Sequence, residues 1–597
     1  MSDQQSFQDA LGFTSIAEGI NSNFKKAEEL MQEFSNKSEP IDWDPLKAGD
    51  VYKELFAKMS QNPQNIVQAN IDFWKQGLEL YQNALQGLLT GETPESTVTE
   101  TKSDRRFRHE GWVEQPAFNM IKQSYLLMSQ HVRRLVQETE GLDDKTAARA
   151  EFFTQLYLDA MSPTNFMSTN PQVIEKVIET KGMSLVSGLK NMMNDLERGE
   201  GKLQISMTDY SAFELGKNVA TTEGKVVYEN RMFQLIQYNP LTENVNQTPL
   251  LIIPPWINKY YILDLQEKNS LIRWLSAQGH SVFVISWVNP DASYAEVGFE
   301  EYIKEGILEA IDAIEQATGE TQVNAVGYCI GGTLLGTTMA YLAAKGEERI
   351  KSATFLTSML DFEAPGELGL FIDEEQISSL EDKMDREGFL DGNQMAGTFN
   401  LLRANDLIWS FYVNNYLLGN DLRPFDLLYW NSDSTRMPAK MHKWYLRNLY
   451  LENNLIKPGK LSIDGEAIDL ANIKTPAMFV STLDDHIAPW KSTWSGAQRL
   501  GGPVKFILGG SGHIAGVVNP PEANKYGYRM TAAKIPKDAQ NWADKAAKHE
   551  GSWWPEWDKW VGKYKGSEVA ARQPGDHKLE VIEDAPGRYV KAKIVKI

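Results

Sequence analysis

Residues 323–332, Val-Asn-Ala-Val-Gly-Tyr-Cys-Ile-Gly-Gly, constrain the fold of this chain more than any other stretch. They predict a short buried strand, a sharp glycine-rich turn and a helix. Gly327, Cys329 and Gly331 match a nucleophile elbow, in which side chains at the two glycine positions would collide with neighbouring backbone. The turn places Cys329 at a helix N-terminus, which favours a thiolate and a developing oxyanion. Cys329 is the only cysteine, and this setting favours a nucleophile over a buried core thiol.

Composition narrows the function further. The 597 residues are enough for several domains, and a single cysteine excludes an internal disulfide. The formal charge of −20 argues against nucleic-acid binding, which needs a basic face. The first residues lack the basic start and apolar core of a signal peptide, and no apolar run is long enough to span a bilayer. We therefore expect a cytoplasmic protein without a transmembrane segment.

The first two hundred residues have a helical pattern. Residues 1–89 are predicted to form an amphipathic helical N-terminal region, 90–103 a polar linker, and 104–211 a helical domain with helices over 112–128 and 145–161. After Pro63, apolar residues recur in alternating steps of four and three, the spacing of a coiled coil: Val67, Ile71, Trp74, Leu78, Tyr81, Leu85 and Leu88. This apolar stripe either packs on the chain's own helices or docks a partner or an apolar surface.

Residues 212–597 predict an α/β-hydrolase-like catalytic domain. Short β-type runs alternate with helical stretches such as 263–278 and 299–318, which indicates a mostly parallel sheet covered on both faces. The predicted strands are 225–228, 233–238, 249–254, 281–286, 324–326, 352–357, 477–481 and 504–508. Between about 361 and 448 the alternation stops. This aromatic block is expected to be a cap insertion over the active site, the alternative being a packed subdomain without a role in access.

A cysteine nucleophile needs a base and an acid that orients the base. In this fold they follow in the order nucleophile, acid, histidine. His513 follows the strand 504–508 on a Gly/Ser loop, and Asp485 follows the preceding strand. We therefore expect the triad Cys329, Asp485 and His513. His486 is the alternative base and Asp484 the alternative acid.

The remaining site expectations concern the oxyanion and the choice of sulfur. The second oxyanion donor of this fold comes from the loop after an early strand, here 254–259, so the backbone N–H groups of Ile330 and of Trp256 or Ile257 are the candidates. An acyl group on cysteine remains a thioester and stays activated for transfer to an alcohol. Cysteine therefore suits acyl transfer better than hydrolysis.

These segments resemble the poly(3-hydroxyalkanoate) synthases. The resemblance extends from about residue 103 to 555 and rests on the elbow 327–332 and on six further motifs: Pro-Pro-Trp-Ile-Asn-Lys-Tyr-Tyr-Ile-Leu-Asp-Leu at 254–265, Ser-Trp-Val-Asn-Pro-Asp at 286–291, Asp-Phe-Glu-Ala-Pro-Gly-Glu-Leu-Gly at 361–369, Tyr-Trp-Asn-Ser-Asp-Ser-Thr at 429–435, Asp-His-Ile-Ala-Pro-Trp at 485–490 and Ser-Gly-His-Ile-Ala-Gly-Val-Val-Asn-Pro-Pro at 511–521. Chain length and the helical N-terminal region resemble the class I enzymes, which act without a second type of subunit.

The resemblance implies an acyltransferase that polymerises (3R)-3-hydroxyacyl-coenzyme A, above all the 3-hydroxybutyryl thioester, with release of coenzyme A (CoA). It assigns Cys329 as nucleophile, His513 as general base and Asp485 as triad acid, with no metal and no cofactor beyond the CoA of the substrate. It also implies a homodimer, and an enzyme bound to the growing polyester chain and the granule surface, where granule coat proteins are possible partners.

Two other functions compete with this interpretation. A cysteine-dependent thioesterase or esterase would use the same triad on water, and a non-catalytic granule-binding scaffold would be marked by a broken triad. Near the C-terminus, Trp553, Trp554, Trp557 and Trp560 form an aromatic cluster that we interpret as core or interface rather than as a polymer-binding surface.

Overall fold

The computed structural model describes residues 22, 25–26, 47–90, 96–98, 104–531 and 535–593. They divide into two compact units: Met1–Asp209 with Gly397–Arg423, and Tyr210–Ala396 with Pro424–Ile597. The predictions for residues 1–46 lie almost wholly outside the described residues, as does most of the linker 90–103. Gly397–Arg423, inside the predicted cap 361–448, groups with the helical unit. The boundaries of the cap stay a prediction.

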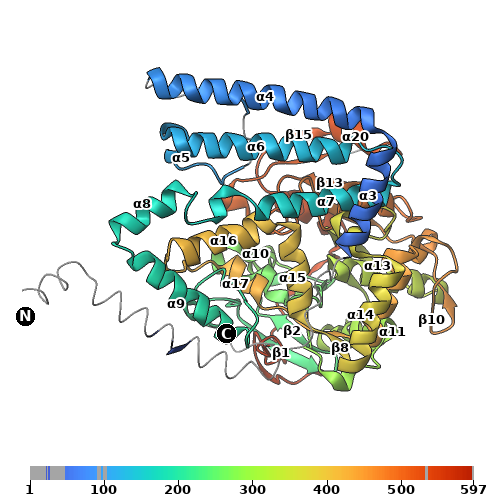
Figure 1. Cartoon of the computed structure of the whole chain (residues 1–597). Coiled ribbons are helices and arrows are strands. Elements are labelled where there is room, and N and C mark those ends of the chain that lie inside the picture. The colour runs from blue at the N-terminus through green and yellow to red at the C-terminus, as the bar shows by residue number, and fades with distance from the viewer. Residues whose placement is uncertain are drawn as a thin grey trace, which may run out of the picture. The chain divides into compact units, whose positions relative to one another are not determined.

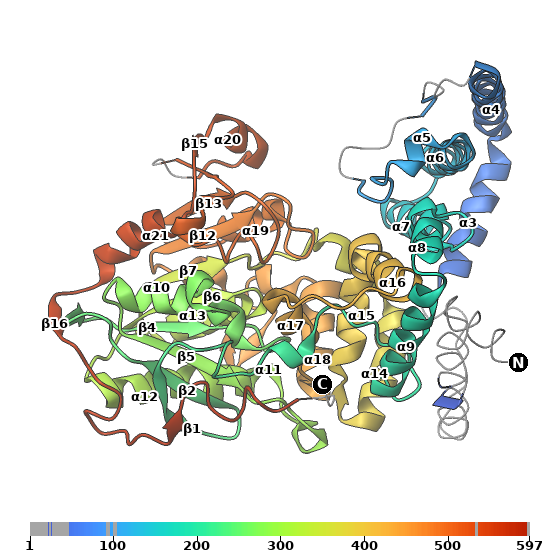
Figure 2. The ribbon, with the colours of Figure 1, turned by 90° about the vertical axis from the view of Figure 1, so that its left-hand side faces the viewer.

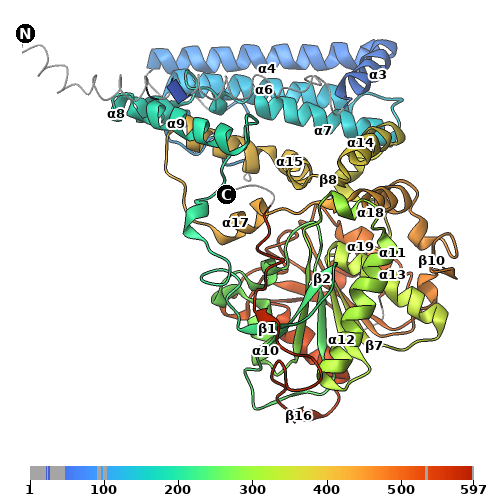
Figure 3. The same ribbon diagram turned by 90° about the horizontal axis from the view of Figure 1, so that it is seen from below.

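The helical unit is built from long amphipathic helices. Figures 1 and 3 show α4, α6 and α7 side by side, and α4 and α7 each pack against α6. Side-chain caps fix some helix starts, since the Asp143 carboxylate accepts from the N–H groups of Lys145 and Thr146 at 3.1 Å. The main helices are α3 (Ala48–Gln61), α4 (Pro63–Thr90), α6 (Pro116–Gln137), α7 (Asp144–Ala160), α8 (Pro171–Glu179) and α9 (Met183–Arg198).

The predicted helix 112–128 is wrong at both ends. A short helix, α5 (Gly111–Glu114), stops at Gln115, and α6 then begins at Pro116 and runs on to Gln137. Gln115 is extended, with φ −97° and ψ 114°, because a residue before proline is pushed out of the helical region. Pro116 itself is well placed as the first residue of a helix.

The apolar stripe of α4 faces away from the helices it packs on. Ala69 and Leu80 are buried, whereas six of the seven stripe residues are between 43% and 72% exposed: Val67, Ile71, Trp74, Leu78, Tyr81 and Leu85. The side chain of the seventh, Leu88, lies outside the described part of the chain. Packing against the chain's own helices therefore does not account for the stripe among the described residues. The helix has two apolar faces, of which one is covered.

The second unit holds an eleven-stranded sheet, visible in Figure 2. All eight predicted strands form, and the six in its centre run parallel in the order β13-β12-β7-β6-β4-β5, with antiparallel strands at both edges. The α/β-hydrolase-like fold class is thus confirmed. The predicted strands correspond to β1 (Gly224–Glu229), β2 (Phe233–Tyr238), β4 (Leu250–Ile253), β5 (Val282–Trp287), β6 (Val323–Tyr328), β7 (Ile350–Leu356), β12 (Ala477–Thr482) and β13 (Val504–Gly509).

Alternating strand residues divide between two cores, one on each face of the sheet. On one face, Phe283 and Phe355 pack with helices α12 (Glu309–Thr318) and α13 (Ile330–Lys345). On the other, Val284 packs with α10 (Leu271–Ala277) and α21 (Trp554–Val561). The tryptophans 553, 554, 557 and 560 are at most 7% exposed in this second core, which confirms the core interpretation.

The predicted helix 263–278 begins later than expected. Two 3-10 turns, Tyr260–Asp264 and Glu267–Asn269, precede α10, which starts at Leu271 after the Ser270 hydroxyl caps it. The buried carboxylate of Asp264 holds the irregular segment because it accepts hydrogen bonds from the hydroxyls of Thr222 and Ser270. Hydrogen bonds to such distant partners leave no periodic pattern in the sequence.

Among the described residues, no helix has the length and apolarity needed to cross a membrane.

Candidate active site

Cys329 sits at the tip of a strained turn between β6 and α13. Its φ of 52° and ψ of −124° lie in a region that a residue with a side chain rarely adopts. The turn is held because the Cys329 N–H donates to the Leu356 carbonyl at 2.9 Å. The side chain is half-buried. The backbone thus presents the thiol at the carboxyl ends of the parallel strands, where this fold class places its sites.

The two elbow glycines are needed for close approach of backbone. A Cβ on Gly327 would collide with the Cα of Gly332, and one on Gly331 would collide with the carbonyl oxygens of Ile253 and Pro254. The start of α13 therefore packs directly against the end of β4, with no room for a methyl group between them.

We expect Gly331→Ala to destabilise the protein by about 3 kcal/mol or more, although alanine favours helices, because rigid backbone atoms cannot move aside. Urea unfolding measures this. The matched control is Gly562→Ala, where nothing lies within 4 Å of the added Cβ and φ is −55°. Equal unfolding free energies for the two variants would contradict the packing described for the elbow.

Asp485 and His513 form a hydrogen-bonded pair. The His513 Nδ1 lies 2.7 Å from the Asp485 Oδ2, and both side chains are buried. The other carboxylate oxygen accepts from the N–H groups of Ile487 and Ala488 at 2.9 and 2.8 Å, which fixes the carboxylate. Asp484, the alternative acid, is exposed. The structure thus brings Asp485 to His513, while the catalytic roles of both stay a prediction.

The surroundings of His513 favour its protonated form. Burial alone would lower the pKa of His513. The charges of Asp485 and of the Cys329 thiolate, with hydrogen bonds to both side chains, outweigh burial and raise this pKa well above its ordinary value. The ring of Tyr328 stacks on the imidazole with centroids 5.8 Å apart, and so helps to orient it. The charge of Cys329 contributes to this shift, so the imidazole and the sulfur lie close enough to interact electrostatically.

The three oxyanion candidates lie on the two segments that meet at the elbow. Ile330 is the first residue of α13, so its N–H belongs to the first turn, which has no acceptor within the helix. Trp256 and Ile257 lie in the loop after β4, whose end touches Gly331. The arrangement permits two donors near the sulfur, and their role stays a prediction.

Sequence reasoning missed two tyrosines beside the nucleophile. Burial, and then charges that include the Cys329 thiolate, raise the pKa of Tyr445 and of Tyr450. Their rings lie 5.5 Å apart, and that of Tyr450 lies 4.9 Å from the ring of Phe362. The three rings therefore pack on one another, and the charge of Cys329 acts on both tyrosine hydroxyls. The only signal in the sequence was the general aromatic character of the block 361–448, which does not single out these residues.

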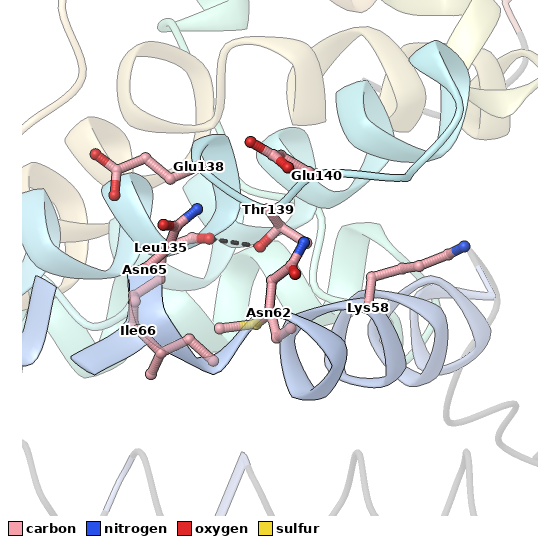
Figure 4. Close-up of a pocket in the computed structure, with 9 residues that line it drawn as sticks. Lys58, Asn62, Asn65, Ile66, Leu135, Glu138, Thr139 and Glu140 are labelled. Carbon is pink, nitrogen blue, oxygen red and sulfur yellow. Dashed lines mark hydrogen bonds between the residues drawn. The ribbon is translucent and has the colours of Figure 1, made fainter. Parts of the chain in front are cut away.

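A pocket lies within the helical unit (Figure 4). Helices α3, α4 and α6 form it, and no triad residue lines it; its residues are Lys58, Met59, Asn62, Asn65, Ile66, Leu135, Glu138, Thr139 and Glu140. We do not assign it to the reaction because it holds neither a nucleophile nor an activating base.

Among the described residues, no three histidine, cysteine or acidic side chains gather as metal ligands would.

Comparison with known proteins decides the family. Residues 103–275 match the family model described as poly-beta-hydroxybutyrate polymerase (PhaC) N-terminus, and residues 248–520 match that of the alpha/beta hydrolase fold. A poly(3-hydroxyalkanoate) polymerase subunit PhaC from Rhizobium meliloti is 47% identical over 91% of this chain and 89% of its own length. The chain belongs to the poly(3-hydroxyalkanoate) polymerase family.

Other members of the polymerase family agree with this assignment. The Methylorubrum extorquens polymerase is 47% identical over 89% of this chain and 88% of its own, and the Cupriavidus necator subunit is 45% identical over 82% and 83%. The expected resemblance is confirmed, and with it an acyltransferase. The hydrolase-fold match, 248–520, contains the elbow, Asp485 and His513. The polymerase match, 103–275, runs from the helical unit through the loop 254–259.

Proposed function

We propose that this chain polymerises (3R)-3-hydroxyacyl-CoA, with 3-hydroxybutyryl-CoA as the preferred monomer, through a covalent acyl-cysteine at Cys329. The observation that carries the proposal is an elbow cysteine whose charge acts on His513, which is itself hydrogen-bonded to Asp485, in a chain of the polymerase family. The chain acts without a second type of subunit, as class I enzymes do. No metal or further cofactor takes part.

The first half-reaction loads the enzyme. The Cys329 thiolate attacks the thioester carbonyl, a carbon–sulfur bond forms, and the carbonyl oxygen takes the negative charge, which the N–H groups of Ile330 and of Trp256 or Ile257 stabilise. The bond from carbon to the CoA sulfur then breaks. The imidazolium of His513 gives its proton to the departing CoA thiolate, which leaves neutral imidazole held by Asp485.

The second half-reaction extends the chain. Neutral His513 takes the proton of the hydroxyl of an incoming hydroxyacyl-CoA, and the alkoxide attacks the acyl-Cys329 carbonyl. The new ester bond forms, the bond to Cys329 breaks, and the thiolate–imidazolium pair is restored. Because the acyl-cysteine is still a thioester, transfer to an alcohol is downhill. In the thioesterase alternative, water would take the place of the hydroxyl.

Incubation with (3R)-3-hydroxybutyryl-CoA tests the proposal. Release of CoA thiol together with an insoluble polyester is the expected result. Thiol release with only soluble 3-hydroxybutyrate would mean a thioesterase. No release with this monomer or with longer 3-hydroxyacyl thioesters would leave the scaffold function.

The setting of the reaction is part of the same proposal. The product is insoluble, so we place the enzyme in the cytoplasm at the surface of the polyester granule, as a homodimer whose cap at about 361–448 opens for substrate. The exposed apolar stripe of α4 is the candidate contact with that surface or with a granule coat protein. It carries little charge, which suits an uncharged apolar surface better than an anionic one.

We expect the double variant Trp74→Ser, Leu78→Ser to reduce binding to purified polyester granules on the order of 10-fold or more, because two large apolar side chains no longer leave water. CoA release in solution should not change. Ile178→Ser is the control, since Ile178 is 72% exposed on α8, outside the stripe. Granule binding by the double variant equal to that of the control would remove the stripe from the proposal.

A further inference from the structure

The loop 254–259, which supplies two oxyanion candidates, is attached along its length to the segment 430–435. Both belong to the same compact unit although about 170 residues separate them. Three contacts join them: the Thr435 hydroxyl donates to the Trp256 carbonyl, Asn258 and Ser434 form an isolated antiparallel bridge, and the Trp430 indole N–H donates to the Lys259 carbonyl at 2.7 Å.

A buried ion pair ends this attachment. The Lys259 Nζ lies 2.6 Å from the Asp433 Oδ1, and the two side chains are 3% and 2% exposed. The second carboxylate oxygen accepts from the Tyr261 hydroxyl at 2.9 Å, and the Lys259 ammonium also donates to the Ala592 carbonyl at 2.7 Å. The pair is therefore hydrogen-bonded on both sides and ties a third segment, near the C-terminus, to the loop.

Stability alone does not explain such a pair. Burial lowers the pKa of Lys259, with the charge of Asp433 working in the opposite direction, so the ammonium is costly to bury. A well-packed apolar pair in the same space is often as stable or more so. The ion pair instead fixes a position. Its short charge-assisted contact determines where the Lys259 side chain lies, and hence where the backbone of Lys259 lies.

The position of the Lys259 backbone affects the orientation of the peptide between Trp256 and Ile257. A trans peptide points its C=O and its N–H to opposite sides. The Trp256 carbonyl is taken by the Thr435 hydroxyl, so the Ile257 N–H points away from the segment 430–435. On its N-terminal side the loop is fixed because the Trp287 indole N–H donates to the Pro254 carbonyl at 2.9 Å. The loop is thus held on both sides of the peptide that carries the candidate donor.

We propose that Lys259 and Asp433 are positioning residues for acylation: their buried ion pair locks the loop 254–259 onto the segment 430–435 and so aims the Ile257 N–H at the oxyanion formed on Cys329. This inference rests on the proposed function. Neither residue touches the substrate. They act through the backbone of the loop, and their loss slows only steps that develop an oxyanion.

Two reactions of Cys329 separate this role from a general structural one. Acylation by 3-hydroxybutyryl-CoA, followed as single-turnover CoA release, passes through an oxyanion. Alkylation by iodoacetamide is a displacement at carbon without an oxyanion and depends only on the thiolate and its access. Because Cys329 is the only cysteine, its alkylation can be followed in the whole protein without interference.

We expect Lys259→Met to lower the acylation rate by about 10-fold to 100-fold, as for a misplaced oxyanion donor, while the alkylation rate stays within about 2-fold of wild type. Asp433→Asn should do the same. Because a lone buried charge can prevent folding, the double variant Lys259→Met, Asp433→Leu is included. This variant replaces the ion pair by two apolar side chains that can pack together, so it should fold. It lacks the charge-assisted contact that fixes the loop, so it should still acylate slowly. Lys304→Met, which breaks an exposed pair with Asp464, is the control.

The outcomes are distinct. A folded double variant that acylates at the wild-type rate overturns the positioning role. An equal fall in acylation and alkylation also overturns it, because the damage would then be to the elbow as a whole. A wild-type protein that is alkylated but releases no CoA from any 3-hydroxyacyl thioester overturns the proposed function and this inference together.

Discussion

Replacing Cys329 with alanine will abolish both CoA release and polyester formation, with a loss on the order of 10³-fold or more, because the only thiol of the chain, which carries the acyl group in this mechanism, is then removed. Serine will not restore activity. It would fit the turn, but an acyl-serine is an oxygen ester, so the free energy that drives transfer to the next hydroxyl would be lost. Thiol release and polymer yield, measured on the same samples, test both variants.

The unfolding transition of these variants is the control. Cys329 is half-buried and at positive φ, so alanine and serine should leave urea unfolding close to that of wild type. Polyester made by the folded alanine variant would contradict the assignment of the nucleophile.

Asp485→Asn will lower the pKa of His513 and slow acylation by about 10²-fold to 10⁴-fold, as when the acid of a comparable triad is replaced. In wild type the charges of Asp485 and of the Cys329 thiolate raise the pKa of His513 against the effect of burial. Without the carboxylate, burial favours neutral imidazole, and the imidazolium that stabilises the Cys329 thiolate is lost at neutral pH.

The pH profile of Cys329 alkylation by iodoacetamide measures this change. In wild type the alkylation rate should stay high through neutral pH, because the raised pKa of His513 keeps a positive charge near the sulfur there. In Asp485→Asn the rate near pH 7 should fall and recover only as the thiol ionises at higher pH. Asp484→Asn is the matched control, since Asp484 is adjacent and exposed. Identical profiles for wild type and Asp485→Asn would show that Asp485 does not set the protonation of His513.

The sequence predicted the parts of the fold that follow local rules. The strands of the sheet are buried on both faces, so each appears as a short apolar run bounded by turn residues, and all eight predicted runs form strands. The elbow could be predicted because its two glycines stand at fixed positions on either side of Cys329 in the sequence. The pairing of Asp485 with His513 follows from strand order, since each residue comes directly after a strand at the same edge of the sheet.

What the sequence did not predict depends on contacts between distant segments. The pair of Lys259 with Asp433 and the tyrosines 445 and 450 beside Cys329 appear only when 430–451 is packed near the elbow. Helix α10 starts late because Asp264 is held by Thr222, far away in the chain. The grouping of Gly397–Arg423 with the helical unit also depends on contacts between distant segments. One of them is the hydrogen bond that the Asn191 amide donates to the Asn415 carbonyl at 3.0 Å.

The most direct test of the central claim is the mass of the Cys329 peptide after a brief reaction with (3R)-3-hydroxybutyryl-CoA and acid quenching. We predict a hydroxybutyryl adduct on Cys329, with adducts of several units at longer times, all removed by hydroxylamine as thioesters are. An adduct on another residue, or none on Cys329 while CoA is being released, would contradict an acyl-cysteine mechanism.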